Sequence, residues 1–117
     1  NILFSGYEDG IRSALENIIR NSIKYSPNNS SIHCKVENIS KKIIISITDE
    51  GKGIKDSDKE KFFEPFYRHP SAQAGDSTGT GLGLAIAKSA IEWNKGIIEA
   101  ITTKKDFTIK ITLPAYN

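Results

Sequence analysis

The fold class follows from residues 32–49, Ile-His-Cys-Lys-Val-Glu-Asn-Ile-Ser-Lys-Lys-Ile-Ile-Ile-Ser-Ile-Thr-Asp. Residues 32–37 and 43–48 alternate apolar side chains with mostly polar ones, which is the period of a β-strand that buries one face. A short Ser-Lys-Lys turn separates the two halves, so the segment predicts a β-hairpin. Its apolar positions are Ile32, Cys34 and Val36 in the first strand and Ile43, Ile45 and Ile47 in the second.

Helical patterns flank this hairpin on both sides. Upstream, Ser5 and Glu8 have the spacing of a capping box, and apolar residues then recur every three or four positions up to Pro27. This predicts a helix over about residues 7 to 25. Downstream, we expect a short helix over about residues 57 to 62 and a helix rich in Ala, Leu and Ile over 82 to 92. The apolar positions of the first helix are Ile11, Leu15, Ile18, Ile19 and Ile23.

Two further strands are predicted at about residues 97–102 and 107–113. The element order is then helix, two strands, loop, helix and two strands. It favours an α+β fold, a two-layer α/β sandwich whose mixed, mostly antiparallel sheet carries about three helices on one face, over a parallel doubly wound sheet. Residues 68–80 lack apolar periodicity and are rich in small and polar residues, so we interpret them as a mobile loop and a candidate lid.

Length and charge narrow the class of protein. The chain has 117 residues, which is the size of one compact domain, so we expect a single domain over residues 1–117. Its net charge of +2 comes from 16 basic and 14 acidic residues spread along the chain, which argues against nucleic-acid binding. The single cysteine, Cys34, cannot close an internal disulfide. The chain does not begin with Met, and we expect it to be a fragment of a longer protein.

The first predicted helix carries a polar edge beside its apolar stripe. Asn17, Asn21 and Lys24 are four and three residues apart, so they share one helix face. Amide oxygens suit a hard cation such as Mg²⁺, and an ammonium group suits phosphate. Taken alone, the same three residues also fit a solvated helix face.

Asp49 ends the second strand of the hairpin. It continues the alternation of the apolar isoleucines, so its carboxylate is expected to point toward the core, where it needs a partner. Gly51 and Gly53 follow, and glycines let the backbone approach a flat ligand closely or adopt a positive φ. The exocyclic amine of adenine has the donor chemistry that Asp49 requires. A plain Asp-Glu-Gly turn is the alternative interpretation.

A glycine-rich motif, Gly79-Thr-Gly-Leu-Gly-Leu, precedes the Ala-rich helix. Its alternate glycines expose backbone N–H groups near a helix N-terminus, a setting that attracts phosphate. The motif does not match the dinucleotide-binding fingerprint, because Leu84 or Ile86 occupies the place of the third glycine, and it matches a P-loop only in part. Lys88 and Ser89 are expected inside the helix, as surface or packing residues.

These motifs occur together in the order of one known family. The chain resembles the catalytic, ATP-binding domain of bacterial sensor histidine kinases, within the superfamily that includes gyrase, the ninety-kilodalton heat-shock chaperones and the mismatch-repair ATPases. The resemblance implies the Bergerat-type ATP-binding fold. Residues 14–21, the Phe-Tyr-Arg segment and the closing Leu-Pro-Ala-Tyr are similar to the Cpx-type envelope-stress sensors. Four segments carry the family resemblance: 15–27 resembles the N box, Asp49-Glu-Gly-Lys-Gly-Ile the first glycine box, Phe63-Glu-Pro-Phe-Tyr-Arg the F box and 79–86 the second glycine box.

The resemblance implies a role for each matching position. Asn21 would bind Mg²⁺, Asn17 and Lys24 would face the phosphates, and Tyr25 would lie beside the base. Asp49 would accept a hydrogen bond from the adenine amine. We also expect Phe63 and Phe66 to be hydrophobic anchors, Trp93 to pack the end of its helix, His33 to be solvated and His69 to lie at the surface. The remaining nucleotide-binding positions are Gly51, Gly53 and Ile54 near the base, Arg68 near the terminal phosphate, and Gly79, Thr80, Gly81, Leu82, Gly83 and Leu84 around the triphosphate.

The chemistry expected from the resemblance depends on one position. The superfamily's ATPases place a Glu one helical turn before the Mg²⁺-binding Asn, whereas here that place is Asn17. Glu16 is about 100° around the helix from it. An amide cannot act as a general base, so the resemblance favours transfer of the γ-phosphate to a histidine. ATP hydrolysis, an anti-sigma-type serine kinase and a nucleotide-binding module without chemistry are the alternatives.

The resemblance also implies cofactors and partners. ATP and Mg²⁺ are the expected ligands, and the dimerisation and histidine-phosphotransfer domain of the same protein and a response regulator are the expected partners. The family's His box is not recognisable around His33 or His69, so the acceptor histidine is expected outside this segment. We expect the full-length protein to be a membrane-anchored homodimer in the bacterial inner membrane, with this domain cytoplasmic and monomeric by itself.

Overall fold

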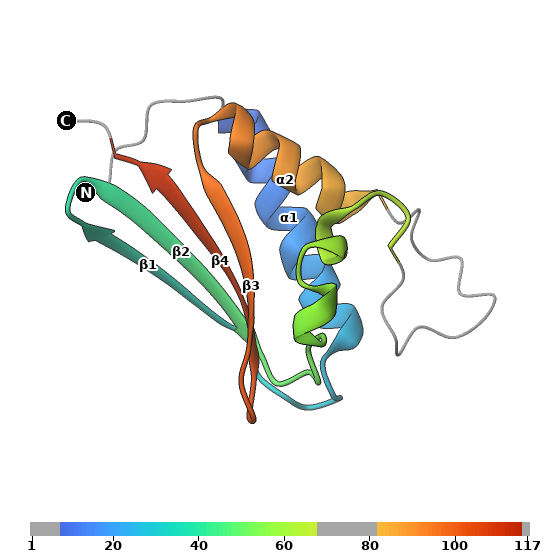
Figure 1. Ribbon diagram of the computed structural model, residues 1–117. Helices are drawn as coiled ribbons and strands as arrows, with labels where there is room; N and C mark the ends of the chain where they lie inside the picture. Colours follow the sequence, from blue (N-terminus) through green and yellow to red (C-terminus); the bar gives the residue numbers. More distant parts are fainter. Residues whose placement is uncertain (1–7, 68–81, 116–117) are drawn as a thin grey trace.

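The computed structural model describes residues 8–67 and 82–115 (Figure 1). In this part of the chain two α-helices and a four-stranded sheet form two layers. The elements in chain order are α1 (Glu8–Tyr25), β1 (His33–Ile39), β2 (Lys42–Asp49), the 3-10 helices η1 (Asp56–Asp58) and η2 (Lys61–Phe63), α2 (Gly83–Trp93), β3 (Ile97–Thr102) and β4 (Phe107–Pro114).

The sheet has the strand order β1-β2-β4-β3, and each pairing among these strands is antiparallel. The predicted α+β sandwich and its four strands are therefore confirmed. The predicted short helix over about 57–62 is different, because this segment forms two separate 3-10 turns. The predicted lid and the capping serine, Ser5, lie outside the described residues.

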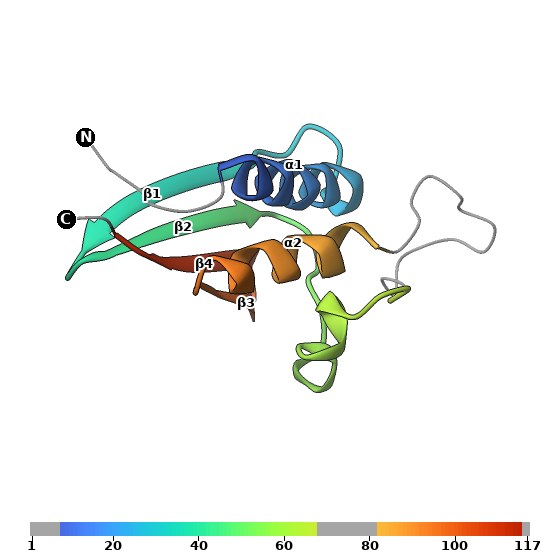
Figure 2. The same cartoon turned by 90° about the horizontal axis from the view of Figure 1, so that it is seen from above.

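Both α-helices lie on the same face of the sheet, and α1 and α2 pack side by side (Figures 1 and 2). Helix α1 packs against β2, and α2 packs against β3. The core between the layers comes chiefly from β2 and β4. In β4 every second side chain is buried, including Ile109, Ile111 and Leu113, and β2 adds Ile43 and Ile47, with Ile45 half-buried between them. Each such side chain contributes about 1.5–3 kcal/mol when it is fully removed from water.

The hairpin turn between β1 and β2 is the predicted one. Its two central residues, Ser40 and Lys41, both have positive φ, 52° and 64°, which is the conformation of a two-residue turn that matches the twist of the strands. The first strand of the hairpin is less buried than its alternation suggests. Because β1 is an edge strand, Val36 is 52% exposed and Cys34 is exposed.

The buried stripe of α1 also differs in part from the apolar pattern. Ala14, Ile18 and Ser22 are the most deeply buried positions, at successive intervals of four residues. Ile23, one residue past Ser22, is 63% exposed. A residue one place further along a helix points about 100° away, so the stripe leaves Ile23 on the outside.

The strand directions place two loops at one end of the sheet. Strands β2 and β3 are both antiparallel to β4, so they run in the same direction and end at the same edge. Their last residues, Asp49 and Thr102, are both register partners of Phe107. The chain that follows Asp49 therefore passes close to the end of β3, which is where the candidate site lies (Figure 1).

Candidate functional site

The polar edge of α1 meets the beginning of α2. Asn17 and Asn21 are both half-buried. A Cβ atom built on Gly83 would lie 3.5 Å from Oδ1 of Asn17, so the first residue of α2 packs directly on this amide. Arg20 donates a long hydrogen bond, 3.5 Å, to the same oxygen. Glu16 is exposed, in agreement with its predicted place on another face of the helix.

The end of α1 meets the segment that follows β2, residues 51–54, which we call the glycine turn. The ammonium group of Lys24 lies 5.3 Å from the centre of the Tyr25 ring, within the range of a cation–π contact. Lys24 is exposed and Tyr25 is half-buried. A Cβ atom on Gly51 would lie 3.0 Å from the backbone oxygen of Tyr25. The close approach of the helix end, together with that of Oδ1 of Asp49 at 2.8 Å, therefore favours glycine at position 51.

Asp49 is 4% exposed, as its place in the alternation predicts. One carboxylate oxygen, Oδ1, accepts a 2.7 Å hydrogen bond from the backbone N–H of Gly51. Within residues 8–67 and 82–115 no group donates a hydrogen bond to the other oxygen. The carboxylate therefore fixes the turn with one oxygen and has acceptor capacity left for a ligand.

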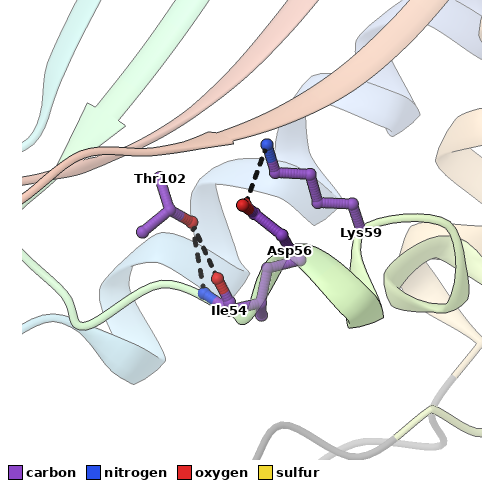
Figure 3. Close-up of polar contacts among 4 residues, drawn as sticks. All are labelled: Ile54, Asp56, Lys59 and Thr102. Atoms are coloured by element: carbon purple, nitrogen blue, oxygen red, sulfur yellow. Dashed lines mark hydrogen bonds and ion pairs between the residues drawn. The ribbon is translucent and has the colours of Figure 1, made fainter.

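Gly53 has a positive φ of 70°, the other property for which a glycine was expected in this turn. The segment it belongs to is held by Thr102 (Figure 3). The Thr102 hydroxyl donates a hydrogen bond of 3.0 Å to the backbone oxygen of Ile54 and accepts one of 3.3 Å from its N–H. Thr102 is not predicted from the sequence, because 48 residues separate it from Ile54 and a single sequence does not show which strand ends meet.

The described part of the second glycine box begins α2. Leu82 is the N-cap residue and Gly83 and Leu84 open the helix, as predicted. The side chain of Leu82 has no polar atom, so it cannot satisfy the N–H groups of the first turn. Lys88 and Ser89 lie within α2. Arg68, Gly79, Thr80 and Gly81, together with His69, lie outside the described residues.

An aromatic cluster supports the segment after the glycine turn. Phe62 is 1% exposed, and its ring contacts those of Phe63, Tyr67 and Phe107 edge-on at centroid distances of 5.0, 5.7 and 5.4 Å. Phe63 is buried, as expected of an anchor. The expectation for Phe66 is wrong, because it is 71% exposed on a backbone with a φ of 66°. Phe62 takes the anchoring place instead.

The hydroxyl of Tyr67 is buried in this cluster without a hydrogen-bond partner among the described residues. It lies near the Asp58 carboxylate, outside hydrogen-bonding geometry. Burial first, and then the negative charge of Asp58, raise the pKa of Tyr67 above its ordinary value of 10.0.

Two further expectations concern residues away from this site. Trp93 does not pack the end of its helix, since it is 80% exposed at the last position of α2. His33 is exposed, in agreement with a solvated side chain.

Neither a metal-binding cluster nor a membrane-spanning helix is found in the described part of the chain. Within residues 8–67 and 82–115 no three or more His, Cys, Asp or Glu side chains gather as a metal site would require. None of the helices in this part of the chain combines the length and apolarity needed to cross a bilayer.

The predicted site residues in the described ranges are therefore neighbours in space. Asn17 touches Gly83, Tyr25 touches Gly51, and Gly51 binds Asp49. Asn21 and Lys24 lie on α1 between the first two of these contacts. The arrangement joins amides and a cation on a helix edge, a helix N-terminus without a polar cap, and a buried carboxylate beside a glycine turn. It can bind a ligand that has phosphates at one end and a flat donor group at the other.

This chain is similar in sequence and fold to known proteins. Residues 6–117 match the family model of histidine kinase-, DNA gyrase B- and HSP90-like ATPases. Sensor histidine kinase CpxA of Escherichia coli K12 is 40% identical over 95 residues, which are 81% of this chain and 20% of CpxA. Sensor histidine kinase WalK of Bacillus subtilis is 42% identical over 110 residues, which are 92% of this chain and 18% of WalK. The chain thus spans about a fifth of the length of these relatives.

A solved structure gives the same result. The mycobacterial sensor histidine kinase MprB superposes with a TM-score of 0.86 at 29% identity, over 96% of this chain and 76% of that one. Both the sequence relatives and this structure are named sensor histidine kinases, which confirms the resemblance that the four motifs indicate. The chain belongs to the family of histidine kinase-, DNA gyrase B- and HSP90-like ATPases, and its relatives place it with the ATPase domains of sensor histidine kinases.

Proposed function

We propose that this domain binds Mg-ATP and transfers the γ-phosphate to a histidine on the dimerisation domain of the same sensor protein. The observation that carries the proposal is the state of Asp49. This carboxylate is 4% exposed, and only one of its oxygens is used by the described residues around it. A buried carboxylate with unused acceptor capacity calls for a donor, and the amine of adenine is one.

The base would bind at the end of β2. Asp49 would accept a hydrogen bond from the adenine amine, and Gly51, Gly53 and Ile54 would present their backbone to the ring. Tyr25, half-buried at the end of α1, would border the same space. Guanine has a carbonyl where adenine has this amine, and a carboxylate repels a carbonyl. The site is therefore expected to prefer ATP to GTP.

The phosphates would extend along the polar edge of α1 toward the start of α2. Lys24 supplies positive charge, Asn17 an amide, and Gly83 and Leu84 supply N–H groups at a helix N-terminus, which stabilises anions. By resemblance, Arg68, Gly79, Thr80, Gly81 and Leu82 would complete the triphosphate site.

The residues fit a magnesium ion that is bound mainly by the nucleotide. Asn21 offers one amide oxygen from a half-buried position, and the described residues provide no carboxylate cluster that would form an all-protein site. Mg²⁺ commonly keeps several waters and is bound through one or two protein oxygens and substrate phosphates. When bound, the ion neutralises charge on the phosphates. The protein's part is then to orient that complex through Asn21.

The domain lacks a group to activate water at the expected place. Asn17 occupies the position one turn before Asn21, and Glu16 is exposed on another face. The nucleophile would therefore come from outside, as an imidazole. In the transfer a histidine nitrogen forms a bond to the γ-phosphorus while the bond from that phosphorus to the β–γ bridging oxygen breaks, and ADP leaves.

The test uses this domain and the dimerisation domain of the same protein as separate polypeptides. Alone with labelled Mg-ATP, the ATP-binding domain should acquire no stable phosphate. With the dimerisation domain added, an acid-labile and base-stable phosphoprotein should form on that partner, slowly because the tether that raises the local concentration is missing.

Two variants make the test specific. Asn21→Ala in this domain and replacement of the acceptor histidine in the partner should each abolish labelling, whereas His33→Ala should not change it. Rapid release of inorganic phosphate by this domain alone would support the hydrolase alternative, and labelling of His33 would contradict the proposed division of roles.

For the whole protein we propose the arrangement that the family implies. It would be a membrane-anchored homodimer of the bacterial inner membrane, with this domain on the cytoplasmic side, and it would pass the phosphate to a response regulator.

A further inference from the structure

The glycine turn beside Asp49 is held by very few contacts. Within residues 8–67 and 82–115, the backbone of residues 51–54 makes hydrogen bonds with only two partners, the side chains of Asp49 and Thr102. Asp49 binds the beginning of the turn through Gly51, and Thr102 binds its end through Ile54. A segment without helix or strand hydrogen bonds keeps its shape only as far as such contacts fix it.

Thr102 holds the end of the turn in both directions. Its hydroxyl donates to the Ile54 oxygen at 3.0 Å and accepts from the Ile54 N–H at 3.3 Å, so one side chain satisfies both backbone groups of a residue that is 5% exposed (Figure 3). Figure 3 also shows the neighbouring Asp56–Lys59 ion pair, 3.2 Å long, in which the Asp56 side chain is 90% exposed. An exposed pair of this kind contributes little, so Thr102 is the main restraint here.

The same side chain also limits what can stand at position 53. A Cβ atom on Gly53 would lie 2.8 Å from Oγ1 and 2.9 Å from Cγ2 of Thr102, and Gly53 has a φ of 70°. Thr102 is therefore in close contact with the part of the turn where the backbone is most constrained. Its own position is fixed in turn by the sheet, because it pairs in register with Phe107 of β4.

We propose that Thr102 is a positioning residue for base recognition, which holds the Gly53–Ile54 backbone in the place where it contacts adenine next to Asp49. This inference rests on the proposed ATP site and adds a residue to it. Thr102 itself would not touch the nucleotide. It sets the geometry of the turn, so its loss weakens contacts to the base and leaves contacts to the phosphates on α1 and α2 unchanged.

The experiment compares Thr102→Val, which keeps the shape of the side chain and removes the hydroxyl, with Thr102→Ser, which keeps the hydroxyl. A fluorescent ATP analogue is bound to each variant and displaced by unlabelled ATP, GTP and tripolyphosphate in the presence of Mg²⁺. For Thr102→Val we expect about tenfold weaker ATP binding, the scale of one or two lost hydrogen bonds, with tripolyphosphate binding unchanged. The ratio of ATP to GTP affinity should fall in Thr102→Val, whereas Thr102→Ser should keep the wild-type ratio.

The chain offers a matched control. Thr108→Val makes the same chemical change at a hydroxyl that pairs with Thr48 at 2.8 Å, at a position that alternates with the core-facing residues of β4. Its thermal stability is measured beside that of Thr102→Val, and we expect it to leave the affinities for ATP, GTP and tripolyphosphate at the wild-type values. If Thr102→Val does not fold, Thr102→Ala and Thr102→Ser are compared in the same way.

The outcomes separate this inference from the proposed function. Equal weakening of ATP, GTP and tripolyphosphate, or failure of Thr102→Ser to restore the ATP/GTP ratio, would show that Thr102 is merely structural. Unchanged ATP affinity in Thr102→Val would also overturn the inference. If the wild-type domain itself does not bind ATP, the proposed function fails, and that result is visible before any variant is made.

Discussion

The β2–β4 ladder and the segment from Gly51 to Tyr67 are held together in different ways. The ladder is continuous over eight register pairs, from Lys42 with Pro114 to Asp49 with Phe107, and one of its faces is a row of buried aliphatic side chains. The segment has two 3-10 turns, a glycine and a phenylalanine with positive φ, and a few side-chain hydrogen bonds. Stability is therefore shared among many residues of the sheet, whereas the shape of the site depends on single contacts.

The largest effect is expected from a cavity in the ladder. Ile109 is 0% exposed and pairs in register with Ile47 of β2 and Ala100 of β3. Ile109→Ala should lower the free energy of unfolding by about 2–5 kcal/mol, through lost burial and an unfilled cavity. Urea denaturation followed by circular dichroism measures this. Ile97→Ala, at a position that is 59% exposed, is the matched control and should change it by less than about 1 kcal/mol. Equal effects would mean that the core is not where the structure places it.

The second prediction separates the two oxygens of Asp49. Asp49→Asn keeps an oxygen that can accept from the Gly51 N–H and replaces the other by an NH₂ donor. We expect the fold to be retained, ATP affinity to fall by about 1.5–3 kcal/mol, or about ten- to a hundredfold, and GTP to gain relative to ATP. Titration of both nucleotides checks this. Glu50→Ala, a change of the neighbouring exposed carboxylate, should leave the preference for ATP intact. A wild-type domain that binds both nucleotides equally would contradict the role given to Asp49.

The contrast between the β2–β4 ladder and the segment from Gly51 to Tyr67 also explains which features a single sequence predicts. The hairpin over residues 32–49 is predicted because alternation is a local pattern that each strand carries by itself. The same pattern predicts that the Asp49 side chain points toward the core, and its burial confirms this orientation. The glycines at 51 and 53 are also local signals, since each marks a close approach or a positive φ.

What the sequence does not predict depends on contacts between distant segments. Thr102 meets Ile54 only because β2 and β3 end at the same edge of the sheet. In the aromatic run, composition predicts apolar anchors but does not show that Phe66 points outward and Phe62 inward, because that depends on the backbone of the turn. Trp93 is similar, since a large apolar residue at the end of a helix is buried only if another element covers that end.

The smallest effect at neutral pH is expected from the aromatic cluster that supports the segment. The Tyr67 hydroxyl is buried without a hydrogen bond to the described residues, so Tyr67→Phe removes a polar group that gains little from folding. At pH 7 the free energy of unfolding should change by less than about 1 kcal/mol, or rise slightly. The contacts of the ring with Phe62 are retained, because phenylalanine has the same ring.

The wild type and Tyr67→Phe should differ in their free energy of unfolding only at alkaline pH. Burial and the charge of Asp58 raise the pKa of Tyr67 in the folded state above 10.0, the value expected for the unfolded chain. The unfolded chain then loses this proton first, so the wild type keeps its full stability below pH 10 and loses it as pH rises from there through the raised pKa, by up to about 1.4 kcal/mol per pH unit. Tyr67→Phe has no hydroxyl at this position to ionise, so it does not lose stability in this way. Urea denaturation at pH 7, 9 and 10.5 should therefore give matching stabilities at the two lower values and a more stable variant at the highest. Parallel profiles for the two proteins would mean that the Tyr67 hydroxyl is solvated in the folded state.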